Sequence, residues 1–130
     1  MSDRKALGNS GELKAIAYLQ QKGYVILKTN WRSGRAEIDI IAQDKNIIVF
    51  AEVKTRTNYA FGFPEASVNT AKQKLMAKAA GNYLHDNNLE NEIRFDIIAI
   101  YYSKENTWDI KHFEDAFFPN PADEIDSFEE

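Results

Sequence analysis

The sequence predicts an α/β (α+β) fold in which helices flank a mixed β-sheet, and three observations support this prediction. Apolar residues recur at helical spacing in two stretches, residues 3–22 and 69–85. Five other stretches are rich in the β-branched and aromatic residues that strands prefer. The resulting order, α-β-β-β-α-β-β, is typical of a sheet covered by helices.

The first half of the chain predicts one helix and three strands. In the helix, Asp3–Lys22, the apolar positions are Leu7, Ala15, Ile16 and Leu19, and Gly23 follows as a C-cap glycine would. Strands are expected at Tyr24–Leu27, Ala36–Ala42 and Asn46–Val53. The turn-like residues 43–46 join the last two, and so short a link predicts an antiparallel hairpin.

The second half predicts a loop, a helix and two strands. Thr55–Pro64 contains Gly62 and Pro64 and is therefore expected to be a loop. The helix Asn69–His85 follows, with its apolar side chains on one stripe and its lysines largely off it. The strands Arg94–Tyr101 and Trp108–Phe113 complete the fold, and Asp96 is expected to pair with Arg94 or to cap a sheet end.

Length and charge predict a single domain with an acidic end. The chain has 130 residues, which fits one domain, expected at residues 1–117. Residues 114–130 hold seven acidic side chains and no basic one, so the remaining body carries a balance of +3 within a total of -4. Residues 118–130 are expected to form a flexible tail. A sharper alternative is a tail that competes with nucleic acid for a basic face of the body.

The residue inventory excludes several classes of protein and site. Cysteine is absent, which excludes a disulfide framework, thiolate metal sites and a cysteine nucleophile. No apolar run approaches the length of a signal peptide's core at the start of the chain or of a membrane span later. These features predict a cytoplasmic protein without a membrane partner. His85 and His112 lack a partner at metal-ligand spacing and are excluded from the candidate site.

Acidic residues occur within two strands that should be buried. Alternation predicts that Glu37 and Asp39 lie on one face of their strand, with Ile38 and Ile40 on the other. In the next strand, Glu52 and Lys54 share the face of the apolar residues Ile48 and Phe50. Buried charges are costly unless they are paired or metal-bound, so these acids require an explanation.

Two interpretations of the acids remain open from the residues alone. Asp39 or Glu52 could form a structural ion pair with Lys54 at a sheet edge. Alternatively, the hairpin brings the two carboxylates together, where oxygen ligands can hold Mg²⁺, and Lys54 points into the same pocket.

The same residues resemble a known enzyme superfamily. Asp39 with Glu52-Val53-Lys54, set after a helix and within a three-stranded meander, is similar to the PD-(D/E)xK nucleases. The closest resemblance is to the small bacterial YraN family, over roughly residues 8–117. The segments that carry it are Gly8-Asn9-Ser10-Gly11-Glu12, Asn30-Trp31-Arg32, Glu37-Ile38-Asp39, Glu52-Val53-Lys54-Thr55-Arg56, Lys72-Gln73-Lys74 and Arg94-Phe95-Asp96. The resemblance implies a restriction endonuclease-like α-β-β-β-α-β core.

The resemblance also implies a reaction and its residues. We expect a Mg²⁺-dependent or Mn²⁺-dependent endonuclease or resolvase that hydrolyses phosphodiester bonds in DNA. Asp39, Glu52 and Lys54 are the expected catalytic residues, with Asp39 and Glu52 as metal ligands. Glu12 could add a third carboxylate or hold a second metal, or it could be a solvent-exposed helix charge.

Further basic residues are candidates for contact with nucleic acid. The arginines that flank the expected cleft are Arg32, Arg35 and Arg56, and the start of the second helix adds Lys72, Gln73 and Lys74. Each could instead be an ordinary surface side chain. A lone tryptophan such as Trp31 is more often part of a core than a platform for a base.

Two other functions remain as alternatives to a nuclease. One is a catalytically silent nucleic-acid-binding module with the same fold. The other is a protein-interaction subunit of a DNA-processing complex, in which the Asp-Glu-Lys cluster is a structural ion pair. The presence of both acids and the lysine favours the nuclease, and the resemblance allows a homodimer because such nucleases often dimerise to span two strands.

Overall fold

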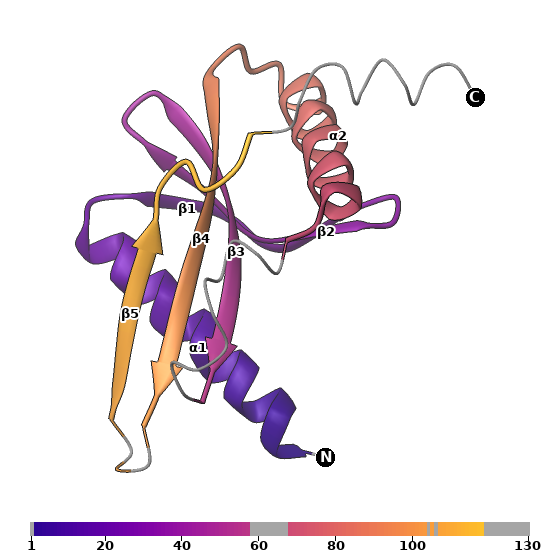
Figure 1. Cartoon of the computed structure of the whole chain (residues 1–130). Helices are drawn as coiled ribbons and strands as arrows, with labels where there is room; N and C mark the ends of the chain where they lie inside the picture. Colours follow the sequence, from indigo (N-terminus) through magenta and orange to yellow (C-terminus); the bar gives the residue numbers. More distant parts are fainter. Residues whose placement is uncertain (1, 58–67, 104, 106, 119–130) are drawn as a thin grey trace.

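A five-stranded mixed sheet organises the computed structural model, which describes residues 2–57, 68–103, 105 and 107–118. The helices are α1 (Ser2–Gln21) and α2 (Thr70–Asp86), and the strands are β1 (Val25–Ser33), β2 (Ala36–Asp44), β3 (Ile47–Arg56), β4 (Glu92–Tyr102) and β5 (Trp108–Phe113). Helix α1 runs across one face of the sheet, and α2 lies against the other (Figure 1). The predicted element order and mixed sheet are confirmed.

The strands lie in their chain order across the sheet, β1-β2-β3-β4-β5. Antiparallel pairing joins β1 to β2, β2 to β3, and β4 to β5. Strands β3 and β4 are parallel. A parallel pair needs a crossover connection, and α2 lies in that crossover.

Four predicted strands, β1 to β4, are longer in the structure than the sequence indicated, and the extensions of β1 and β3 bear on the site. Strand β1 was expected at Tyr24–Leu27 but continues to Ser33, because pairing with β2 extends it through a polar segment that local propensity does not favour. Strand β3 continues to Arg56, so the expected loop does not begin at Thr55. The rest of that loop up to Pro64 lies outside the described residues, as does the expected tail beyond Phe118.

Two apolar cores lie on opposite faces of the sheet. On the α1 face, Ala15 and Leu19 are fully buried against strand residues that include Val49 and Ile98. On the α2 face, Met76, Ala79, Ala80 and Tyr83 pack against Ile41, Ile48, Phe50, Phe95 and Ile97. Trp31 joins this second core, with its ring 5.4 Å from that of Tyr83 in an edge-to-face arrangement. Trp31 is therefore a core residue.

The side-chain alternation of β2 changes at Asp39, which the sequence did not predict. Ile38 packs in the α2-face core and Ile40 in the α1-face core, although the two were expected on the same face. The pairings Thr29–Ile40 and Trp31–Ile38 place Asn30 opposite Asp39, and Asn30 has a left-handed φ of 49°. Asparagine tolerates this conformation better than most residues do. The distortion of both strands lets isoleucines on either side of Asp39 enter different cores.

A buried polar cluster at the sheet's α1 face holds the chain that follows β5. Asp96 is fully buried and accepts hydrogen bonds from Arg94 Nε (2.8 Å) and the backbone N–H of Asp115 (3.0 Å). Nε2 of His112 lies 2.7 Å from the second oxygen of Asp96. The hydrogen bonds from His112 and Arg94 keep the pKa of Asp96 below its usual range despite burial. The predicted Arg94–Asp96 pair is confirmed.

Among the described residues, no helix has the length and apolar composition needed to cross a membrane.

The close approach of α1 to the sheet depends on a glycine. A Cβ added at Gly11 would clash with Oγ1 of Thr55, near the end of β3. Any side chain here would push α1 away from β3, and Glu12 is the next residue along that helix.

We therefore expect Gly11→Ala to destabilise the protein by roughly 1–3 kcal/mol, as overpacked cores do. Alanine otherwise favours helix over glycine, so a loss of stability reports the clash itself. Thr55→Ala in the same chain should restore much of the loss, and chemical denaturation of the four variants of this cycle measures it. Equal destabilisation in the presence and absence of Thr55 would contradict the proposed contact.

Candidate functional site

Asp39 is held where β2 separates from β3. The pairing of these strands extends from Asp44–Ile47 to Ile40–Ala51, and Asp39 is the next residue on β2. Its side chain continues the connection, because Oδ2 accepts a hydrogen bond of 2.8 Å from the backbone N–H of Val53. This bond fixes the carboxylate beside the adjacent residue of β3, Glu52.

Glu52 is a buried acid on the α2 face of β3. Only 5% of it is exposed, and it follows the core residues Ile48 and Phe50 along the same face, as predicted. Nζ of Lys72 lies 2.8 Å from Oε2 of Glu52. The approach does not have hydrogen-bond geometry, so this buried oxygen has a charged neighbour but no hydrogen-bond donor among the described residues. A buried acceptor without a donor is costly and needs an explanation.

The two carboxylates face each other in a poorly solvated place. Burial, together with a side-chain hydrogen bond and charge repulsion from Glu52, raises the pKa of the Asp39 carboxyl to about 8. The N–H of Val53 acts in the opposite direction but does not outweigh these effects. Near neutral pH, the pair therefore tends to hold one proton between its two carboxyl groups.

Lys54 lies next to this pair on the same face of β3. Burial lowers the pKa of its ammonium, and the charges of Lys72 and Arg56 lower it further. Glu52 and Asp39 raise it and only partly offset the burial. The structural ion pair considered from the sequence is different from the observed one, because Lys72 rather than Lys54 lies within ion-pair distance of Glu52.

Glu12 of α1 lies close enough to add to the negative potential at Asp39. Its charge raises the pKa of the Asp39 carboxyl, as the smallest of the named contributions. Among the residues that the structure describes, no group of three His, Cys, Asp or Glu side chains is arranged to hold a metal. Within the described part of the chain, Asp39 and Glu52 therefore offer two carboxylates, and Glu12 does not complete a three-ligand group with them.

The pair nevertheless fits a divalent cation. Among the residues that the structure describes, the buried Oε2 of Glu52 has a charged neighbour, Lys72, but no donor in hydrogen-bond geometry, and both carboxylates supply the hard oxygen ligands that Mg²⁺ prefers. Mg²⁺ usually keeps several waters and takes only one or two carboxylates from the protein. Two facing carboxylates therefore suffice for such an ion.

The remaining predicted residues occupy three different places. Arg32 forms an exposed ion pair of 2.9 Å with Glu37, and Arg56 donates to the carbonyl of Thr55 at its own strand end. On α2, Gln73 donates to the carbonyl of Val68 (2.9 Å) and so supports the start of the helix. Lys74 is half-buried on α2 and Arg35 is exposed in the β1–β2 turn. Of the six predicted nucleic-acid contacts, only Lys72 touches the carboxylate pair.

Sequence reasoning missed two residues that shape this site. Lys72 was expected to contact nucleic acid, and its ion pair with Glu52 was not foreseen. Its position is set by the N-cap, because the side chain of Asn69 accepts a hydrogen bond from the Lys72 N–H at 2.9 Å. Asn30, opposite Asp39, carries the left-handed backbone, and the only signal was an asparagine within a strand-like run.

Removing one charge from the pair should stabilise the metal-free protein. An acid whose pKa is higher in the folded than in the unfolded state loses stability as pH rises, here between about 4, the ordinary value of aspartate, and about 8. Asp39→Asn keeps an acceptor for Val53 and mimics the protonated acid. We expect it to be more stable than wild type above pH 8 in EDTA, by more than about 1.4 kcal/mol, the equivalent of one pKa unit.

Urea denaturation between pH 4 and pH 9 measures this difference. It should be small at the acidic end and grow through the interval, whereas the exposed control Glu90→Gln should show no such trend. A difference that is independent of pH would show that Asp39 is not destabilised by its neighbours.

Comparison with known proteins identifies the family. Residues 11–100 match the profile of the uncharacterised protein family UPF0102. A UPF0102 protein of Flavobacterium psychrophilum is 50% identical over 118 residues, covering 91% of this chain and 98% of that protein. Another, from Thermodesulfovibrio yellowstonii, is 49% identical over 115 residues and covers 88% and 98%. A third, from Bacteroides thetaiotaomicron, is 40% identical over 119 residues and covers 92% and 98%. The chain therefore belongs to the UPF0102 family, the same family that its motifs indicated as YraN.

Proposed function

We propose that this protein is a Mg²⁺-dependent endonuclease that hydrolyses phosphodiester bonds in DNA, within a cytoplasmic setting. The observation that carries the proposal is the facing pair Asp39 and Glu52, in which the buried Oε2 of Glu52 has the Lys72 ammonium at 2.8 Å but no donor in hydrogen-bond geometry among the described residues. The lysine Lys54, whose pKa is lowered, lies beside that pair. This is the acid, acid and lysine set of the PD-(D/E)xK nucleases, which the sequence resembles.

Each side chain has a chemical task that fits its environment. Asp39 and Glu52 would hold the cation, with water or a backbone carbonyl completing its ligands. A bound Mg²⁺ supplies positive charge for the phosphate and lowers the pKa of a water. Lys54 would orient or deprotonate the attacking water, or balance the charge that develops on the phosphate. Lys72 already places an ammonium against Glu52 and would balance negative charge in the cleft when no cation is present.

Cleavage of DNA tests the proposal directly. We expect purified protein with Mg²⁺ or Mn²⁺ to nick at least one DNA in a panel of supercoiled, linear, flapped and four-way-junction substrates, and EDTA should stop the reaction. Asp39→Asn, Glu52→Gln and Lys54→Gln should each reduce the rate by at least about 100-fold, the usual cost of losing one electrostatic contact in the transition state.

The matched controls are Glu90→Gln and Lys45→Gln, two exposed positions away from the carboxylate pair. Both should keep the wild-type rate. Activity that survives in Asp39→Asn or Glu52→Gln would come from a contaminant or another site. DNA binding without cleavage of any substrate would instead support the catalytically silent module.

Binding of the metal can be measured without any substrate. Mg²⁺ at about ten times its dissociation constant should stabilise the folded protein by about 1.4 kcal/mol, because a ligand of the native state stabilises it by mass action. At constant ionic strength, thermal unfolding should show this rise for wild type and Glu90→Gln. Glu52→Gln should show none. An equal rise in Glu52→Gln would place the metal elsewhere.

A further inference from the structure

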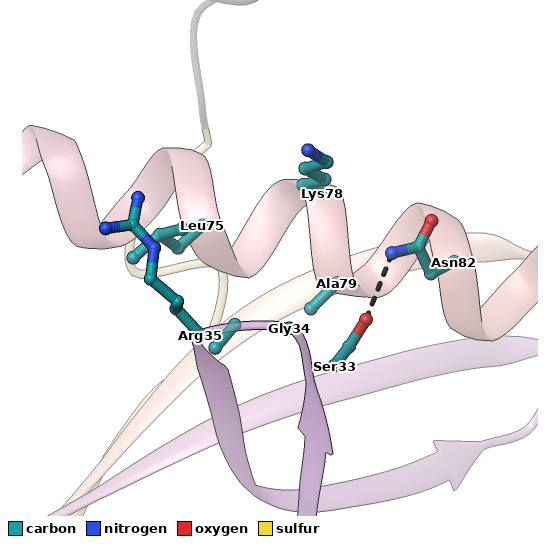
Figure 2. Close-up of a pocket in the computed structure, with 8 residues that line it drawn as sticks. Ser33, Gly34, Arg35, Leu75, Lys78, Ala79 and Asn82 are labelled. Atoms are coloured by element: carbon teal, nitrogen blue, oxygen red, sulfur yellow. Dashed lines mark hydrogen bonds between the residues drawn. The ribbon is translucent and has the colours of Figure 1, made fainter.

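A groove lies between the β1–β2 turn and α2, apart from the carboxylate pair described above. It consists of two adjoining hollows, of about 260 and 380 Å³. The first lies between Ser33, Gly34 and Arg35 of the turn and Lys78, Ala79 and Asn82 of α2. We call the two hollows together the hairpin groove. A hydrogen bond of 3.0 Å from Asn82 Nδ2 to Ser33 Oγ spans it at one end (Figure 2).

The two hollows share part of their walls and so form one path. Arg35, Ala36 and Leu75 line both of them. The second hollow is also lined by Lys72, whose ammonium lies against Glu52. The hairpin groove therefore runs along α2 from Asn82 toward the helix start, where it is lined by Lys72, the residue whose ammonium contacts Glu52.

Two cations border the groove, with the Arg35 side chain alongside it and the Lys78 ammonium directed out of it (Figure 2). Arg35 and Lys78 come from different elements, and within the described part of the chain neither makes a hydrogen bond or an ion pair. In Figure 2, the Arg35 side chain reaches from the turn alongside Leu75, and the Lys78 ammonium points away from the hairpin. Glu37 is the acid in the second hollow, and Arg32 offsets its charge at 2.9 Å. The net field along the path therefore favours an anion.

The walls suit an extended, repeating anion. Gly34, Ala36 and Ala79 have small side chains or none, so a backbone can approach closely. Leu75 adds an apolar side chain to the lining of both hollows. Each hollow has about the volume of a small-molecule pocket, which accommodates one strand but is too small for a duplex.

We propose that the hairpin groove binds the sugar-phosphate backbone of a single nucleic-acid strand and leads it to Asp39, Glu52 and Lys54. Arg35 and Lys78 contact successive stretches of that backbone, and Lys72 meets the strand where it enters the cleft. The inference rests on the proposed nuclease function and specifies its substrate as DNA with a single-stranded segment. Because phosphate contacts carry no base information, binding is independent of sequence.

The test uses binding in EDTA, so that its result does not depend on cleavage. The probe is a fluorescein-labelled oligothymidylate of about 16 nucleotides, the upper site size of one single-strand-binding domain. Fluorescence anisotropy gives its affinity for the full chain over a series of salt concentrations. Arg35→Gln with Lys78→Gln removes two positive charges from the groove. Lys28→Gln with Lys45→Gln removes two from exposed positions that line neither hollow.

The two double variants change the net charge equally, so a difference between them reports the groove. For the groove variant, we expect weaker binding and a plot of log affinity against log salt that is flatter by about 1.4, since each phosphate contact on a single strand contributes about 0.7. The control should keep nearly the wild-type slope. Equal effects in both variants, or no change in either, would overturn the proposal.

A gain of charge tests the same path without removing any side-chain contact. Ala71 is exposed and lines the second hollow, so Ala71→Lys should tighten binding and steepen the slope by about 0.7. The exposed control Gln20→Lys on α1 should leave the slope unchanged.

A duplex of the same length should lose less affinity than the single strand in the groove variant. Equal losses would overturn the single-strand assignment.

The outcomes also separate the groove from the nuclease. Selective loss of binding in the groove variant, with no cleavage by wild type, would uphold the groove and reject the proposed reaction. Metal-dependent cleavage that needs Asp39, together with identical behaviour of groove and control variants, would uphold the reaction and reject the groove.

Discussion

The break in strand alternation at Asp39 is the constraint on which the rest of the site depends. A regular β2 would send Ile38 and Ile40 to the same face, whereas the two side chains enter the cores of opposite faces. The left-handed backbone of Asn30 lies opposite this break. Because the strand is distorted here, the Asp39 carboxylate can turn along the sheet and accept the N–H of Val53. That one bond holds Asp39 beside Glu52 and so produces the charge repulsion between the two carboxylates.

The surrounding residues reduce the charge repulsion between Asp39 and Glu52 but do not remove it. The N-cap at Asn69 fixes the first turn of α2, and this turn presents Lys72 to Glu52. The ammonium balances charge without satisfying the buried oxygen in hydrogen-bond geometry. Buried ion pairs such as Lys72–Glu52 add little net stability, because removing both charges from water is costly. Carboxyl groups with strongly shifted pKa values, such as Asp39, are most frequent at functional sites. Proteins typically tolerate such local cost at functional sites and offset it with packing, here the two cores on either face of the sheet.

The sequence sufficed to predict the elements, their order and the face that Glu52 shares with Ile48 and Phe50, because these follow from periodicity. It could not predict the length of β1, since residues 28–33 are polar apart from Trp31 and are strand only because β2 pairs with them. The alternation change at Asp39 was also missed, because it depends on the backbone of a partner strand rather than on neighbours in sequence. Lys72 was predicted only as a nucleic-acid contact, and its ion pair with Glu52 was missed because that pair requires the parallel crossover that returns α2 over β3. These three features depend on contacts between residues distant in sequence, which local sequence patterns do not predict.

The parallel pairing of β3 with β4 has a consequence for how the molecule assembles. The hairpins β1–β2–β3 and β4–β5 join neighbours in the chain, whereas β3 and β4 are separated by the crossover that contains α2. Contacts between segments distant in sequence cost more loop-closure entropy than contacts between neighbours. The β2 and β3 carboxylates come from strands joined by a short turn, whereas Lys72 reaches Glu52 only when the crossover between β3 and β4 is closed. The charge balance of the carboxylate pair is therefore coupled to the most costly connection in the sheet.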